Sequence, residues 1–111
     1  YKRQELNGSI LRSYRMTAYK SLVFEEVTPY KKEIMQCLKQ AIDTYQVQKT
    51  QEVNESGELL SAYYRLSRVT RKGKKVNRYI LYKVGKQQKA TLVYIEGPLD
   101  EDELMEMLYK Q

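Results

Sequence analysis

The sequence predicts an α+β domain with a four-stranded, mainly antiparallel sheet, and three observations lead to this prediction. The chain has 111 residues, of which 41% are hydrophobic, which is the size and composition of one domain with one core. Three β-rich runs follow one another closely between residues 59 and 96, and segments with helix-start signals lie before and after them. We therefore expect the order strand, helix, strand, strand, strand, helix, with the helices mainly on one face of the sheet. Residues 1–111 form a single domain in this prediction, and residues 1–9 are expected to be flexible.

The first strand is expected within residues 10–24, where apolar or aromatic residues alternate loosely with charged ones. Thr28 and Pro29 then form a helix start, because threonine can cap free amide groups and proline loses no hydrogen bond at the first helical position. A helix should continue to about Gln46. Its apolar stripe repeats every three or four positions and consists of Tyr30, Ile34, Cys37, Leu38, Ala41 and Tyr45.

A loop is expected over residues 48–58, where the composition is polar and contains Gly57. Three strands follow at residues 59–69, 75–84 and 90–96. Gly73 and Gly85 lie in their connections, which are too short for a parallel crossover. These three strands therefore form an antiparallel meander. Both sets of alternating positions in the last strand are apolar, so both faces of the sheet can be covered.

The last helix is expected from Asp100 to about Lys110. Asp100 and Glu103 have the spacing of a capping box, in which each side chain accepts a hydrogen bond from the other residue's amide group. Leu99 and Leu104 have the spacing of a hydrophobic staple. The sequence therefore predicts a short helix with a well-defined first turn.

Three segments resemble a family of small uncharacterised exported proteins of Bacteroidales bacteria. They are residues 77–82, residues 91–97, and the acidic last helix with Met107 and Leu108 near its end. The resemblance covers about residues 14–109 and lies in strand cores and a turn, so it implies no reaction. It implies a signal peptide before Tyr1 and residence in the periplasm or cell envelope. The absence of methionine at residue 1 is in keeping with this expectation.

Enzyme chemistry is not expected, because the chain contains no histidine and therefore none of the usual catalytic triads. Cys37, the single cysteine, lies on the apolar stripe and is expected to be a small buried core residue rather than a reactive thiol. Acids at positions 96 and 100–103 could hold calcium, but acids in a first helical turn also favour the helix dipole. We predict no enzyme, no metal and no cofactor. The sequence also has no apolar run of the length that a membrane helix needs.

Positive charge is concentrated in the predicted meander. Residues 59–95 contain ten Lys and Arg residues and no acid, whereas residues 96–111 contain six acids and one lysine. One interpretation is that the acidic last helix lies near the meander and the opposite charges balance within the molecule. Another is a docking surface for an acidic protein, an anionic polysaccharide or an anionic lipid headgroup, with tyrosines as contact residues.

The function predicted from these patterns is a non-catalytic, exported binding or accessory domain that uses a basic, tyrosine-bearing sheet surface. The residues expected to form this surface are Arg65, Arg71, Lys72, Lys74, Lys75, Arg78, Tyr79 and Tyr82. The alternative is a single-stranded nucleic-acid-binding domain in a cytosolic protein, which would use cations for phosphates and tyrosines for base stacking. Lysines at hairpin tips are also a common device against aggregation, which weakens this alternative. Oligomeric state is not predicted.

Overall fold

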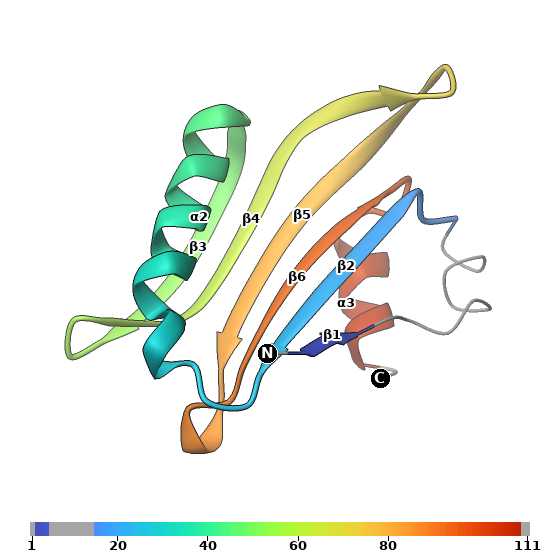
Figure 1. Cartoon of the computed structure of the whole chain (residues 1–111). Coiled ribbons are helices and arrows are strands. Elements are labelled where there is room, and N and C mark those ends of the chain that lie inside the picture. The colour runs from blue at the N-terminus through green and yellow to red at the C-terminus, as the bar shows by residue number, and fades with distance from the viewer. Residues whose placement is uncertain (1, 5–14, 110–111) are drawn as a thin grey trace.

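The protein is described here by a computed structural model that covers residues 2–4 and 15–109 (Figure 1). In these residues the strands form one antiparallel sheet in the order β1-β2-β6-β5-β4-β3. The strands are β1 (Lys2–Gln4), β2 (Ala18–Phe24), β3 (Val47–Glu55), β4 (Glu58–Arg71), β5 (Lys74–Val84) and β6 (Ala90–Gly97). The helices are α2 (Lys31–Thr44) and α3 (Glu101–Tyr109), with the short 3₁₀ turns η1 (Thr28–Tyr30) and η2 (Lys86–Gln88).

The α+β class and the antiparallel meander are confirmed, but the predicted count of four strands is wrong. The described residues contain five strands of 7 to 14 residues and the three-residue β1. The missed long strand is β3, in the segment predicted to be a loop. It is an edge strand, and every residue from Thr50 to Glu55 is exposed. An edge strand exposed on both faces needs no apolar alternation, so its polar sequence resembles that of a loop.

The N-terminal predictions fall partly outside the described residues. Lys2–Gln4 pairs with β2, so this part of the segment expected to be flexible is a strand. The rest of residues 1–9, and residues 10–14 of the predicted first strand, lie outside the described residues. The described part of that first strand begins at Ala18 and ends, as predicted, at Phe24.

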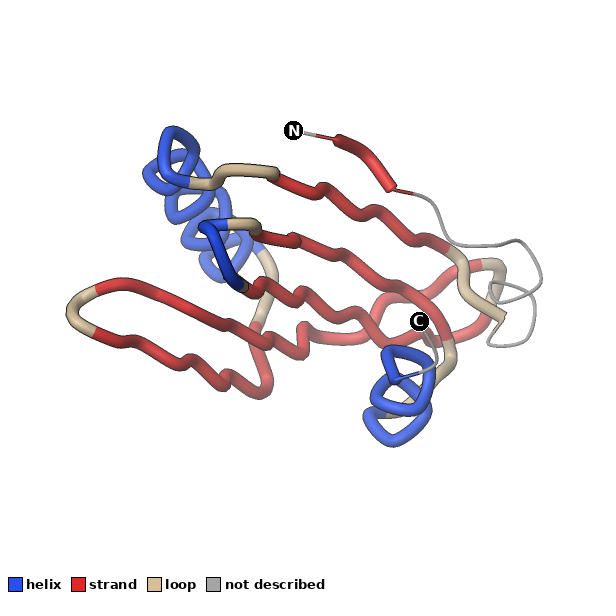
Figure 2. Tube along the Cα trace, turned by 90° about the horizontal axis from the view of Figure 1, so that it is seen from below, coloured by secondary structure: helices blue, strands red, loops and turns tan. Residues whose placement is uncertain are grey.

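The two helices pack on opposite faces of the sheet, which corrects the prediction of one helical face (Figure 2). Ile34 and Leu38 of α2 are buried in one core cluster, together with Tyr64 and Tyr82. Leu104 and Met107 of α3 are buried in the other core cluster, which also contains Tyr63, Tyr79, Val93, Ile95 and Leu99. Neighbouring residues of a strand point to opposite faces, so each central strand contributes to both clusters. The two cores therefore explain why both sets of alternating positions in the last strand, β6, are apolar.

The start of α3 is as predicted, and the start of α2 is not. The amide of Glu103 donates to Asp100 Oδ1 at 2.8 Å, and the amide of Asp100 donates to Glu103 Oε1 at 3.2 Å, which completes the capping box. Thr28 instead begins η1, and its hydroxyl donates to Glu26. The first residue of α2 is Lys31, and no side chain caps it. Pro29 is the second residue of this 3₁₀ turn, which leads directly into the helix.

Candidate functional site

The described residues form a groove of about 1000 Å³ on the α2 face of the sheet. Six strands at about 4.8 Å spacing make a sheet roughly 24 Å wide, whereas a helix is only about 10 Å across. One helix therefore covers part of the face. In Figure 1, α2 lies on the β3–β4 side and leaves β6 and β2 uncovered. We call the space between α2 and these strands the α2 groove.

The floor of the α2 groove has an apolar end. Leu22 of β2 lies opposite Leu92 of β6 in the sheet register, and both side chains are half-buried. Two residues further along, Lys20 lies opposite Tyr94, and Tyr94 lies opposite Ile80 of β5. All five residues line the groove.

The wall of the groove consists of Cys37, Leu38 and Ala41 of α2 and of Tyr45, the residue that follows the helix. Leu38 is buried, but Cys37 is exposed, so the prediction that Cys37 is a core residue is wrong. The thiol lies at the margin of the apolar stripe, on the side of the helix that faces the groove. Sequence periodicity could not distinguish this position from the core, because it does not show how much of the sheet the helix covers.

The other end of the groove contains a buried carboxylate, Glu96, whose side chain is 4% exposed. Arg71 donates from Nε to Glu96 Oε1 at 2.7 Å and from its terminal nitrogen to Oε2 at 3.2 Å. The hydroxyls of Thr17 and Tyr94 donate to Oε1 at 2.8 Å and to Oε2 at 2.9 Å. The Arg71 hydrogen bond is the largest of the effects that lower the pKa of Glu96 to about 2. Glu96 is therefore a permanently ionised structural group near neutral pH.

Arg71 belongs to the β4–β5 hairpin, which extends beyond the ends of the neighbouring strands (Figure 1). The register of this hairpin shifts between Leu66 and Val69, and such an irregularity bends and twists a strand. The ion pair with Glu96 therefore ties the bent hairpin to β6. Lys72 follows in the turn, next to Gly73 at φ +78°, and also lines the groove.

The charged groups that line the groove are Lys20, Arg71, Lys72 and Glu96, which gives a net charge of +2. Glu96 is already bound to Arg71. Lys20 and Lys72 are exposed, and their side chains make no hydrogen bond or ion pair with another described residue. The groove thus has apolar side chains at one end and uncompensated positive charge toward the other.

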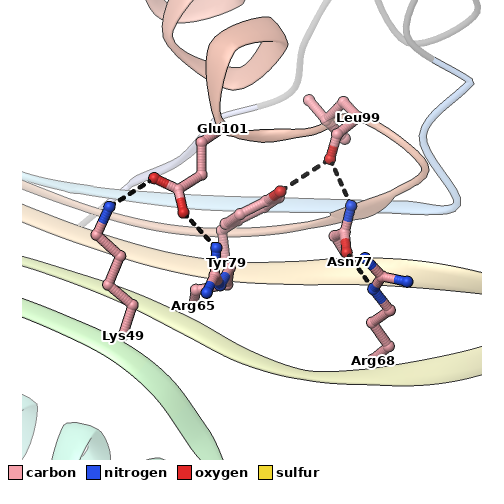
Figure 3. Close-up of polar contacts among 7 residues, drawn as sticks. All are labelled: Lys49, Arg65, Arg68, Asn77, Tyr79, Leu99 and Glu101. Carbon is pink, nitrogen blue, oxygen red and sulfur yellow. Dashed lines mark hydrogen bonds and ion pairs between the residues drawn. The ribbon is translucent and has the colours of Figure 1, made fainter.

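The predicted basic surface is not one surface in the structure. Arg65 points to the opposite face, where it and Lys49 form ion pairs with Glu101 of α3 (Figure 3). Arg78 is 5% exposed and donates from Nε to the carbonyl of Ser67 at 2.8 Å, with its guanidinium 4.7 Å from the ring centre of Tyr45.

Tyr79 and Tyr82, predicted as contact residues, are buried on opposite faces of the sheet. The Tyr79 hydroxyl donates to the carbonyl of Leu99 at 2.8 Å, as Figure 3 shows, so its polar tip is also used within the fold. The remaining predicted cations, Lys72, Lys74 and Lys75, are exposed in or beside the hairpin turn.

Part of the basic charge is balanced within the molecule, as one of the two sequence interpretations expected. Glu101 lies between Lys49 of β3 and Arg65 of β4, and it anchors the first turn of α3 to the sheet (Figure 3). The hydrogen bond from Lys49 is the largest effect that lowers the pKa of Glu101. Asn77 adds a neutral contact by donating to the carbonyl of Leu99 at 2.9 Å.

The sequence analysis missed the α2 groove and its residues. The available signals were the apolar positions Leu22 and Leu92 on the α2 face of β2 and β6, and Glu96 as the first acid after a long basic segment. These signals become a site only when the sheet register places Lys20 opposite Tyr94 and Ala18 opposite Glu96. The pairing joins residues more than 70 positions apart, and local pattern does not determine it.

Other kinds of site are not evident in the part of the chain that the structure describes. No three His, Cys, Asp or Glu side chains gather there in a way that could hold a metal ion. Nor does any helix there have the length and apolar character to span a membrane.

Comparison with known proteins gives one family match. The chain matches the "Family of unknown function (DUF6108)" over residues 1–108. No curated protein matches the chain.

Proposed function

Since the chain belongs to this family of unknown function, we propose from its geometry that it is a non-catalytic binding domain that holds an apolar ligand in the α2 groove. One observation carries the proposal: half-buried Leu22, Leu92 and Tyr94 line an open groove of about 1000 Å³ beside α2. Ligand sites are typically concave and mostly apolar, with a few polar groups that orient the ligand. The groove has this composition, because its charged groups gather toward one end.

Two features favour binding over catalysis. Glu96 is the buried carboxylate of the groove, and its bonds to Arg71, Thr17 and Tyr94 leave it fully ionised rather than available to exchange protons near neutral pH. The exposed thiol of Cys37 has no histidine to activate it, because the chain contains none.

The nucleic-acid alternative is less well supported than a groove ligand. Base stacking needs exposed aromatic rings. Of the meander tyrosines, Tyr63, Tyr64, Tyr79 and Tyr82 are at most 7% exposed, and Tyr94 is half-buried with its hydroxyl bound to Glu96.

An exported location and a Bacteroidales origin remain part of the proposal. Both come from the resemblance of residues 77–82 and 91–97, and location is independent of the groove. A secretory signal encoded upstream, together with recovery of the native protein in the periplasmic or envelope fraction, would support export. Recovery in the cytosol would contradict it.

The binding proposal is tested by titrating the protein with a neutral apolar probe, 1-decanol, and following methyl signals by NMR. We expect the methyl groups of Leu22, Leu92 and Leu38 to shift, while those of Leu104 on the α3 face do not. Unchanged signals in the groove, or equal shifts on both faces, would contradict the proposal.

Alkylation of Cys37 with N-ethylmaleimide provides a blocking control, because the added group projects from the groove wall. We expect this modification to weaken decanol binding. The matched control is the variant Cys37→Ser with Gln40→Cys, in which the alkylated residue is exposed on α2 outside the groove. Equal binding by both alkylated proteins would place the probe elsewhere.

A further inference from the structure

We infer that the α2 groove selects a single-chain amphiphile with a terminal anionic group, such as a long-chain carboxylate, and binds it in one orientation. This inference rests on the proposed function, because it adds a headgroup preference to a site argued from its apolar lining. The alkyl chain lies between α2 and the leucines of β2 and β6. The anionic group lies toward Lys20, Arg71 and Lys72.

The size of the groove fits one extended chain. From Leu22 to Ala18 the floor runs four residues along β2, about 13 Å at strand spacing. From Cys37 to Tyr45 the wall runs eight residues along α2 and the residue that follows it, about 12 Å at helical rise. The wall and the floor also end at the same place. Tyr45 lies over Arg78, and in the sheet register Arg78 is opposite Glu96, which is opposite Ala18.

The positive charge of the groove favours a ligand whose headgroup is anionic. Glu96 neutralises one cation through its pair with Arg71, and the exposed ammonium groups of Lys20 and Lys72 remain without a described counterion. An anion placed beside them gains two favourable interactions, whereas a cation would be repelled. At the leucine end, Leu22, Leu92 and Leu38 are hydrocarbon side chains without a charged group, and Cys37 contributes a thiol.

An extended peptide fits the groove less well than an amphiphile. Peptides that bind to sheets usually gain affinity by pairing their backbone with a free strand edge. Strands β5 and β6 of the floor each have a strand on both sides, so their backbone groups are already paired. Recognition in the groove must therefore use side chains, which suits a ligand that consists of a chain and a charged head.

The test compares three probes with the same chain: decanoate, 1-decanol and decyltrimethylammonium. Binding to the full chain is measured by calorimetry near neutral pH and below the micelle concentration. Two exposed ion pairs are together worth about a tenfold change in affinity. We therefore expect decanoate to bind about tenfold more tightly than decanol, and the ammonium compound most weakly.

The variant Lys20→Gln with Lys72→Gln should lower decanoate affinity about tenfold, so that decanoate binds no more tightly than decanol does. The matched control is Lys75→Gln with Lys83→Gln, which removes the same charge from exposed lysines outside the groove lining. The control should bind decanoate as the unmodified protein does. Equal loss in both variants would show a general charge effect and overturn the inference.

The outcomes separate the inference from the proposed function. If decanol binds in the groove and decanoate binds no better, the headgroup preference is wrong and the binding proposal stands. If none of the three probes binds, the proposed function is itself wrong. Pelleting with vesicles of anionic phospholipid tests the other source of an anionic head. Vesicle binding that requires Lys20 and Lys72, without decanoate binding, would replace the free amphiphile by a membrane surface.

Discussion

Replacing Glu96 with glutamine should destabilise the fold by about 2 kcal/mol near neutral pH. The lowered pKa, about 2 compared with 4.5 for an unperturbed glutamate, means that the folded state favours the ionised form by up to about 3 kcal/mol. We expect less than this limit, because the Arg71 side chain is 50% exposed and water screens its interaction with the carboxylate. Glutamine preserves the shape of the side chain, but its single oxygen can accept from only one of the two hydroxyls, Thr17 or Tyr94, that donate to Glu96, so the loss near neutral pH includes a hydrogen bond as well as the charge.

The pH dependence distinguishes this charge effect from a packing effect. A carboxyl group with a lowered pKa in the folded state stabilises the protein fully above its unfolded value of 4.5 and loses this contribution as the pH falls toward 2. By about pH 3, more than half of the difference between the original protein and Glu96→Gln should be gone. Urea unfolding followed by circular dichroism measures both proteins at each pH.

The control is Glu58→Gln, which removes an exposed ion pair between Glu58 and Lys31. A pair of this kind contributes about 0–1 kcal/mol, so this variant should lie close to the original protein. Two results would refute the reasoning: equal stability of the Glu96→Gln and Glu58→Gln variants near neutral pH, or a Glu96→Gln difference that does not shrink in acid.

Three other predictions concern the fold around the groove and the opposite face. Gly97→Ala should cost about 1–3 kcal/mol of stability, because the added Cβ would lie 3.0 Å from the backbone of Met16. Gly85→Ala should cost less, because the nearest atom to its added Cβ is 3.7 Å away. Thermal melting of the two variants measures the difference. Cys37 should react with iodoacetamide in the folded protein at a rate near that of the urea-unfolded chain, and strong protection without ligand would contradict its exposure. Burial, followed by the charges of nearby acids, raises the pKa of Tyr79 to about 12. The stability that the neutral Tyr79 contributes should therefore be complete below pH 10 and be lost between pH 10 and 12. In ¹³C NMR of the labelled protein, titration of Tyr79 near pH 10 would contradict the raised pKa.

Local chemistry in the sequence was sufficient for the elements that depend on neighbouring residues. The capping box of Asp100 and Glu103 and the hairpin at Gly73 are each determined within a few positions, and both occur in the structure. Strand β3 was missed because its exposed residues are mostly polar and show no alternating apolar pattern. The side of the sheet on which each helix packs was also mispredicted, because it depends on which of two apolar faces each helix meets.

The predicted basic surface shows a different limit. Positive charge is concentrated in the meander, but a charge count does not show which cations already have partners in the fold. Arg65, Arg71 and Arg78 bind Glu101, Glu96 and Ser67, and two of these three contacts cross more than 20 positions of sequence. The lysines of the turn make no side-chain hydrogen bond or ion pair with another described residue, so the free positive charge is smaller than the charge count indicates and lies on these lysines.

Two parts of the α2 face of the sheet, β3 on one side and β2 with β6 on the other, differ in the side chains that they present, and this difference supports a ligand. On β3, the α2-face positions opposite Tyr64 and Ala62 are Thr50 and Glu52, which are exposed polar residues of the kind expected on a surface without a binding role. On β2 and β6, which α2 leaves uncovered, the corresponding positions include the half-buried Leu22 and Leu92. Placing leucines in water has a free-energy cost, and substitution by threonine or glutamate would remove it. If these leucines served only the core, variants with threonine at both positions would lose stability but keep the affinity of the original protein for decanol. We expect the variants to fold with reduced stability, because both leucines also pack against the core cluster on the α2 face, and to lose affinity for decanol, because the leucines form the apolar part of the groove floor.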